Sequence, residues 1–252
     1  MLDRALALAL DPARMMTEAG MEPDLWQREA MTSDAPRSLI LATRQGGKSS
    51  VAAARSVWEA VCNPPALVVM LSPSLRQSSE LFRKALDVWR SVADLAPATA
   101  ETTLRLELQN GSRIVSLPSS EGTIRGYSGV RLLVVDEAAR VSDELYYAVR
   151  PMLAVSEGRL IAMSTPFGRR GWFFDAWQLG GASWSRTKIT AFECPRIAAE
   201  FLEVEKAAMP ARWFAQEYLC EFADAEDSAF DYELVSAAVT DEVRPLFEQG
   251  AQ

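Results

Sequence analysis

Residues 39–50 read LILATRQGGKSS, an apolar run followed by a glycine-containing loop and the start of a helical pattern. Residues 42–49 fit the phosphate-loop pattern of Ala or Gly, four residues, then Gly-Lys and Ser or Thr, with Ala42 where Gly is commoner. Gly46 and Gly47 let the backbone approach an anion closely. The helix beginning near Lys48 directs amide N–H groups and its positive dipole end at the same anion. The segment therefore predicts a phosphate-binding loop.

The expected nucleotide contacts follow from this loop. Lys48 would reach the β- and γ-phosphates, and the Ser49 hydroxyl would join the shell of a Mg²⁺ ion. The residues predicted to hold the phosphates are Gln45, Gly46, Gly47, Lys48, Ser49 and Ser50, with Arg44 beside them.

A second motif, LLVVDE at residues 132–137, follows 88 residues after the loop lysine, counted to Asp136. An apolar strand there delivers two carboxylates at its carboxyl end, where ligands bind in open parallel sheets. We expect Asp136 to hold Mg²⁺ through water and Glu137 to orient the attacking water. Neighbouring acids need a cation to coexist, which Mg²⁺ and Lys48 would supply. Both motifs in this order predict an ATPase, and Glu137 favours hydrolysis over simple nucleotide binding.

Two further segments are candidates for the same site. Ser164 and Thr165 follow another apolar run, and Thr165 either senses the γ-phosphate and couples its loss to the domain or belongs to a capping turn. Upstream, the amide of Gln27 can make a paired donor and acceptor contact with adenine. Trp26 either stacks on the base or packs in the core.

The rest of the chain alternates strands and helices. Apolar runs at 39–41, 66–71, 132–135 and 160–163 predict buried strands, and 104–108 with 114–117 predict a hairpin. Helices are expected over about 48–62, from 74 to about 92 and from 142. This alternation predicts an α/β fold with helices on both faces of a mostly parallel sheet.

Charge divides the chain in two. Its 252 residues carry a net charge of −8, yet residues 192–252 hold 14 acids and 4 bases whereas 1–191 hold 20 acids and 22 bases. We therefore predict a core over 1–191 and an acidic helical lid or linker subdomain over 192–252. A uniformly basic nucleic-acid-coating protein is excluded, but DNA gripped by a few arginines is not.

Other classes are excluded by composition. The chain has no histidine, so Ser-His-Asp and Cys-His catalysis and imidazole metal ligands cannot occur. Its three cysteines form no CxxC pair, which argues against a zinc site and a disulfide framework. The apolar run at 5–10 is too short for a signal peptide or a membrane span, so no membrane partner is expected.

Taken in order, these motifs resemble the ATPase domain of large terminase subunits, the motors of tailed bacteriophages. The resemblance covers roughly residues 20–222. It rests on WQ (26–27), ATRQGGKS (42–49), SPSLRQ (72–77), IRG (124–126), VVDEA (134–138), STPFGRRGWF (164–173) and WFAQEYLCEF (213–222).

The resemblance implies a P-loop NTPase fold of the ASCE type and ATP hydrolysis with Mg²⁺ that translocates double-stranded DNA into a procapsid. It implies a homo-pentameric ring on the portal protein, a small terminase subunit as partner and a place in the host cell cytoplasm, although the domain alone could be monomeric. On the family pattern, Arg125 is the trans-acting arginine finger or else a loop-packing or ion-paired arginine, and Arg44 is the next candidate. The family's C-terminal nuclease domain is expected to be absent from these residues, because the stretch after Phe222 has no acidic cluster for two metals.

Three other functions fit parts of the pattern. A helicase of the DEAD-like superfamily shares the loop, the Asp-Glu pair and the Ser/Thr motif, but needs a second RecA-like domain. A small-molecule P-loop kinase needs a substrate lid and does not need Glu137. A non-hydrolysing nucleotide switch is disfavoured by the same residue.

Overall fold

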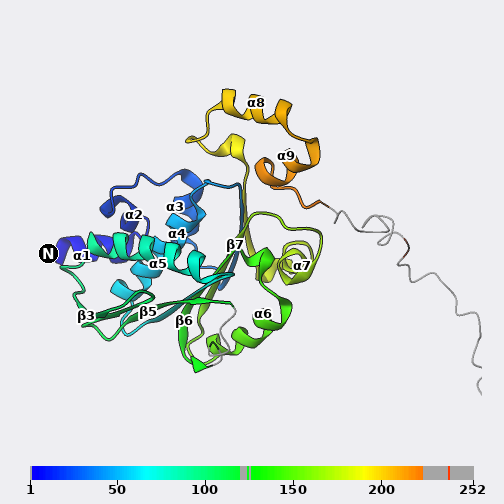
Figure 1. Cartoon of the computed structure of the whole chain (residues 1–252). Helices are drawn as coiled ribbons and strands as arrows, with labels where there is room; N and C mark the ends of the chain where they lie inside the picture. The colour runs from blue at the N-terminus through cyan, green and yellow to red at the C-terminus, as the bar shows by residue number, and fades with distance from the viewer. Residues whose placement is uncertain (1, 120–123, 125, 224–237, 239–252) are drawn as a thin grey trace, which may run out of the picture.

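A single eight-stranded sheet organises the protein, in the order β3-β4-β5-β2-β6-β7-β1-β8 (Figure 1). The computed structural model describes residues 2–119, 124, 126–223 and 238. All neighbours from β5 to β8 in this order pair in parallel, whereas β3 and β4 add an antiparallel edge. The strands are β1 Arg37–Ala42, β2 Leu67–Ser72, β3 Ala98–Glu101, β4 Arg105–Leu108, β5 Arg113–Pro118, β6 Val130–Asp136, β7 Arg159–Ser164 and β8 Ser185–Ile189.

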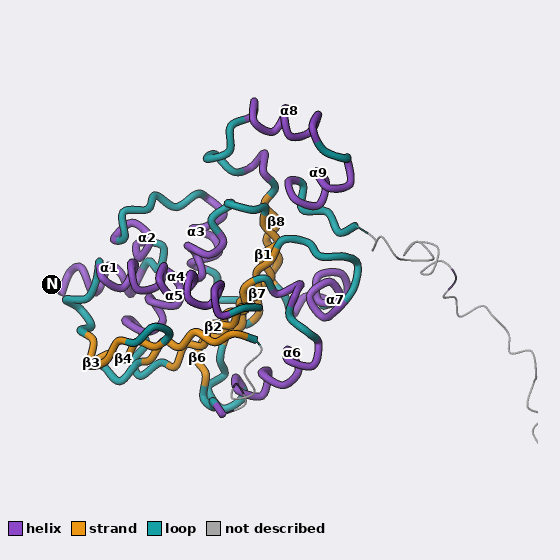
Figure 2. Tube along the Cα trace, in the orientation of Figure 1, coloured by secondary structure: helices purple, strands orange, loops and turns teal. Residues whose placement is uncertain are grey.

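Helices cover both faces of the sheet (Figure 1). The first five lie on one face, α6 and α7 lie on the other, and α8 and α9 lie beyond β8 (Figure 2). The α-helices are α1 Leu2–Leu10, α2 Arg14–Glu18, α3 Leu25–Thr32, α4 Lys48–Cys62, α5 Leu75–Arg90, α6 Asp143–Val149, α7 Gly171–Leu179, α8 Ala199–Ala208 and α9 Ala211–Tyr218. Short 3₁₀ turns occur at η2 Ala138–Arg140, η3 Arg150–Leu153, η4 Gly181–Ser183 and η5 Ala191–Glu193.

The protein has two hydrophobic cores, one on each face of the sheet, because successive side chains of a strand point to opposite faces. In β1, Ile40 and Ala42 face the core under α1–α5, whereas Leu39 and Leu41 face the core under α6 and α7. Because both faces are covered, every residue of β2 is buried, as expected for a parallel strand inside an α/β fold.

Strand register brings the predicted motifs to one edge of the sheet. Leu41 of β1 pairs with Ser164 at the end of β7, and Asp136 at the end of β6 pairs with Met163. Since these strands are parallel, the loops after all three emerge at their shared carboxyl edge. The phosphate loop, the Asp-Glu pair and the Ser164-Thr165 pair are thereby neighbours.

The predicted fold class is confirmed, and the helix expected over 48–62 coincides with α4. Sequence reasoning missed β8 and α7. β8 reads SRTKI and is mostly half-exposed, because it is an edge strand with only one sheet neighbour. It therefore has neither the apolar run of a central strand nor a clear alternation. No helix in the described part of the chain is both long and apolar enough to cross a membrane.

Candidate active site

The loop between β1 and α4 has the backbone conformation of a tight anion cradle. Gln45 and Gly47 adopt left-handed conformations, with φ of +58° and +94°. A Cβ on Gly47 would lie 2.4 Å from Gln27 Nε2, and one on Gly46 would lie 3.1 Å from the Thr43 carbonyl oxygen. The backbone conformation at Gly47 therefore favours glycine, and a larger residue there would also displace the Gln27 side chain. The residues present fit a phosphate group at the start of α4.

Lys48, the first residue of α4, points into this site. Its side chain is largely buried, and Nζ lies 3.1 Å from Glu137 Oε1. Glu137 directly follows β6 and is itself left-handed, with φ of +46°, a conformation that costs a non-glycine residue about 1 kcal/mol or more. The turn after β6 therefore holds the Glu137 carboxylate against the loop lysine.

Asp136 is the most strongly perturbed carboxyl group of the site. It is 7% exposed, and burial together with the Glu137 charge raises its pKa from 3.8 to about 6. Lys48 and the Glu137 N–H, which donates to Asp136 Oδ1 at 3.0 Å, act in the opposite direction. The surrounding protein supplies too little positive charge and too few hydrogen bonds to stabilise an ionised Asp136 carboxylate. A bound divalent cation would stabilise that negative charge.

The predicted Mg²⁺ residues lie on neighbouring elements. Ser49 and Ser50 are half-buried in the first turn of α4, and Asp136 ends β6. Among the residues that the structure describes, no group of three or more acidic or cysteine side chains is placed to hold a metal. Ser49 and Asp136 can thus supply only part of a Mg²⁺ shell, and phosphate oxygens and water would supply the remainder, as is usual for Mg²⁺.

Of the hydroxyl pair after β7, Ser164 makes the contact with the Asp-Glu turn. Its Oγ donates to Glu137 Oε2 at 3.5 Å and accepts from the Ala139 N–H at 3.3 Å. Thr165, which the sequence favours as the coupling residue, is buried beside it at 2% exposure. The sequence pattern is compatible with a contact from either the Ser164 or the Thr165 hydroxyl. The register of β7 decides which of the two faces Glu137.

The upstream pair has two different environments. Trp26 is buried in the core under α1–α5. Gln27 Oε1 accepts from the Asp24 N–H at 2.9 Å in a capping box at the start of α3, while Nε2 donates to the Gly47 carbonyl at 3.4 Å. Gln27 therefore joins α3 to the phosphate loop, and an adenine contact would have to share its amide with these bonds.

Arg44 and Arg125 are the two candidates for the arginine finger. The Arg44 side chain is 66% exposed, and its Nε donates to Glu217 Oε2 in α9 of the same chain at 2.6 Å. Arg125 lies outside the described residues.

Contacts from the segment after β8 complete the site, and sequence reasoning missed them. Arg196 donates from Nη2 to the Gly46 carbonyl and from Nη1 to Asp24 Oδ1, each at 2.9 Å. On the other side of the loop, Thr43 Oγ1 donates to the Glu217 carbonyl at 2.9 Å. The acidic segment thus holds the loop from two sides. No local motif marks Arg196, and the 213–222 stretch that contains Glu217 does not reveal this contact, because the partners lie 150 or more residues away.

Comparison with known proteins identifies the family. The family model "Terminase large subunit, T4likevirus-type, N-terminal" matches residues 39–237. The large terminase subunit of Thermus virus P23-45 is 25% identical over 248 residues, covering 84% of this chain and 51% of that protein. The chain therefore spans about half the length of this curated relative.

Solved structures share the fold. The large terminase ATPase domain of Thermus phage P74-26 superposes with a TM-score of 0.74 at 20% identity, covering 83% of this chain and 98% of that one. The large terminase of another thermophilic bacteriophage, in complex with ATP-γ-S, gives a TM-score of 0.62 at 13% identity, covering 83% and 52%. The fold is therefore that of terminase ATPase domains.

Proposed function

The chain belongs to the family of T4likevirus-type large terminase subunits, represented by their N-terminal part, and we propose that it is an ATP-hydrolysing motor for DNA packaging. In this proposal, ATP hydrolysis drives double-stranded DNA into a procapsid. The observation that carries the ATPase step is the ion pair between the buried Lys48 and the half-buried Glu137, 3.1 Å apart beside the glycine loop.

Substrate binding follows from the loop. The phosphates of ATP would lie on residues 45–50, facing the start of α4. Gln27 is the proposed contact to adenine. The neighbouring Trp26, also in α3, packs in the core and so fixes the position of this helix. Ser49 and Asp136 would hold Mg²⁺, which supplies neutralisation of charge on the phosphate oxygens when bound.

The Lys48–Glu137 pair suggests how binding prepares hydrolysis. The Lys48 ammonium can face either the Glu137 carboxylate or the γ-phosphate at close range, so ATP competes with Glu137 for it. A carboxylate released in this way would orient a water molecule and accept its proton. Ser164 keeps a second hydrogen bond to Glu137, so the released carboxylate stays positioned by the end of β7. Thr165, next to Ser164, is the proposed link from the phosphates to β7.

Substituting Glu137 tests this step. Glu137→Gln should bind ATP with near-normal affinity and hydrolyse it about 10²-fold or more slowly, because general-base catalysis is lost. Glu80→Gln, at an exposed Glu on α5, is the matched control and should leave turnover unchanged. Near-normal turnover in Glu137→Gln would refute the assignment.

The arginine finger is a separate proposal. We propose Arg125 as the residue that reaches the γ-phosphate of a neighbouring subunit, with Arg44 as the next candidate. Arg125→Ala mixed with the unmodified chain should reduce ATPase activity more steeply than dilution does, because one altered subunit disables its neighbour. A linear decrease would argue against a finger acting between subunits.

Assembly partners are proposed from the family alone. They are a homo-pentameric ring, the portal protein and a small terminase subunit, in the host cell cytoplasm. Sedimentation of the chain with and without portal, alongside its ATPase rate, tests whether activity depends on ring formation.

A further inference from the structure

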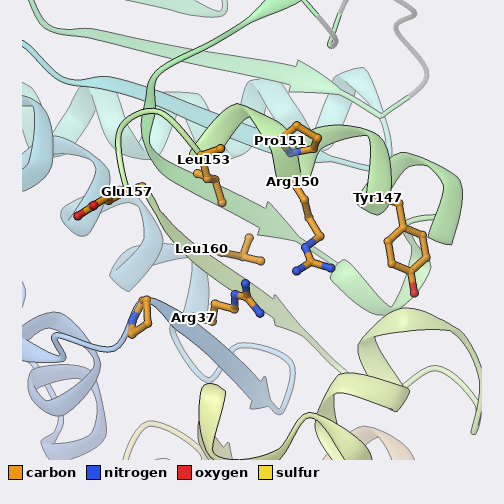
Figure 3. A pocket seen from close by; sticks show the side chains of 10 residues that line it. Arg37, Tyr147, Arg150, Pro151, Leu153, Glu157 and Leu160 are labelled. Carbon is orange, nitrogen blue, oxygen red and sulfur yellow. The ribbon is translucent and has the colours of Figure 1, made fainter.

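A second pocket lies at the opposite edge of the sheet from the phosphate loop. Arg37 begins β1 and Leu160 is the second residue of β7, so the cavity opens at the amino ends of these parallel strands. It holds about 600 Å³, within the range of roughly 300–1,000 Å³ of small-molecule sites. Leu153, Leu160 and Pro151 contribute apolar side chains to its lining (Figure 3), and Pro36 lines it as well.

Two arginines point into this pocket. Figure 3 shows the guanidinium groups of Arg37 and Arg150 facing the same space between β1 and η3. Each side chain is half-buried, and each packs against an aromatic ring: Arg37 Cζ lies 5.9 Å from the Trp184 ring centroid, and Arg150 Cζ lies 5.5 Å from that of Tyr146. These ring contacts hold both guanidinium groups in place.

Among the residues that the structure describes, neither of these arginines has an acidic partner, in contrast to their neighbours. At the same edge, Arg159 pairs with Asp34 at 3.1 Å, and Arg131 pairs with Glu59 at 2.9 Å. Within the described part of the chain, Arg37 and Arg150 form no ion pair with any carboxylate. Glu157 lines the cavity, but its carboxylate points away from the two guanidinium groups (Figure 3).

Two permanently charged guanidinium groups that share a partly dehydrated space repel each other unless an anion lies between them. Planar donor forks match phosphate oxygens in pairs. Tyr147, 58% exposed at the rim, adds an aromatic face on which a base can stack. We propose that this pocket binds the phosphate of a nucleotide, either as a free nucleotide or as a unit of nucleic acid, through Arg37 and Arg150. The proposal does not depend on ATP hydrolysis at Lys48.

The test is calorimetric titration of the full chain, with the phosphate loop first saturated by ADP and Mg²⁺. The titrants are dAMP, inorganic phosphate and a short DNA duplex. We expect dAMP or the duplex to bind, with inorganic phosphate competing. Arg37→Gln and Arg150→Gln should each weaken binding by about tenfold or more, the usual effect of losing a charge-assisted hydrogen bond. The matched control is Arg113→Gln, an exposed arginine that begins β5 at the same edge.

Comparing the titrants distinguishes a free nucleotide from the DNA backbone as the ligand of this pocket. Tight binding of dAMP that Tyr147→Leu weakens indicates a free nucleotide, and tight binding of the duplex alone indicates the DNA backbone. Because ADP and Mg²⁺ already fill the phosphate loop, binding that both Gln variants leave intact would belong to a different site and would overturn the proposal. Tighter binding of an acidic peptide than of any phosphate would overturn it as well.

If the arginine variants fail to fold, the proposal can still be tested by a measurement on the unmodified chain. Saturating dAMP or duplex should shift the arginine Nε NMR signals of Arg37 and Arg150. Unchanged signals from both arginines would refute the proposal.

Discussion

Asp136→Asn should make the nucleotide-free protein more stable above pH 6, although the substitution removes a proposed functional group. The side chain keeps its size, and the asparagine carbonyl can still accept the Glu137 N–H that bonds Asp136 at 3.0 Å. What disappears is a buried negative charge. The carboxyl pKa is raised from 3.8 to about 6, so ionising Asp136 costs more in the folded chain than in the unfolded chain.

The size of the gain follows from the shift. A rise of about two pKa units corresponds to about 3 kcal/mol at pH 8, where Asp136 is ionised in both states. Because the folded pKa is the higher one, this cost is absent below about pH 4 and grows as pH rises through about 6. At pH 5 it should be about half as large. For a domain of this size, 3 kcal/mol corresponds to roughly 6–12 °C in Tm.

Urea unfolding at pH 8 and pH 5, without nucleotide or Mg²⁺, measures both the gain and its pH dependence. Asp87→Asn, at an exposed Asp on α5, is the control and should change stability little at either pH. The reasoning fails if Asp136→Asn is no more stable at pH 8, or if its gain is the same at both pH values. If Asp136 is kept for a cation, ATP with Mg²⁺ should stabilise the unmodified chain more than the variant.

Three further substitutions probe the phosphate loop and the contact between β7 and Glu137. Gly47→Ala should abolish nucleotide binding and lower Tm, because its Cβ would lie 2.4 Å from Gln27 Nε2 at a φ of +94°; nucleotide-dependent thermal shifts measure this, and normal binding would contradict it. Arg196→Met keeps the aliphatic stem but loses the hydrogen bonds to the Gly46 carbonyl of the loop and to Asp24, so ATP affinity should fall by about tenfold, and unaltered affinity in a fluorescent-nucleotide titration would count against the contact. Ser164→Ala should lower kcat about tenfold with KM nearly unchanged, because it removes the hydrogen bonds from Ser164 to Glu137 and to the Ala139 N–H of the same turn; an effect confined to KM in steady-state assays would be inconsistent with this role.

The central sheet was predictable because its strands are buried on both faces. Residues 67–71 of β2 and 132–135 of β6 are continuous apolar runs, a signal that needs no knowledge of tertiary partners. β8 carries no such signal, since no described strand pairs with its outer edge and its side chains are mostly half-exposed. Sequence therefore defines the interior of the fold better than its edges.

The residues of the candidate site likewise fall into those that local sequence predicts and those that depend on tertiary packing. Lys48 and Asp136 were predictable because each stands at a fixed offset from an apolar strand, where local geometry demands that residue type. Arg196 and Glu217 were not, because their role exists only once distant segments pack together. The choice between Ser164 and Thr165 required the register of β7, which adjacent residues in one sequence cannot reveal.

The span of the contacts around the phosphate loop has a consequence for biosynthesis. Thr43 and Glu217 are 174 residues apart, yet one hydrogen bond joins them. At about 5–20 residues per second, a ribosome needs about 9–35 s to travel from one to the other. During that interval β1, α4 and β2 can already be made, while the loop still lacks both side chains that later hold it. A nascent chain therefore has its central strands well before its catalytic loop is secured.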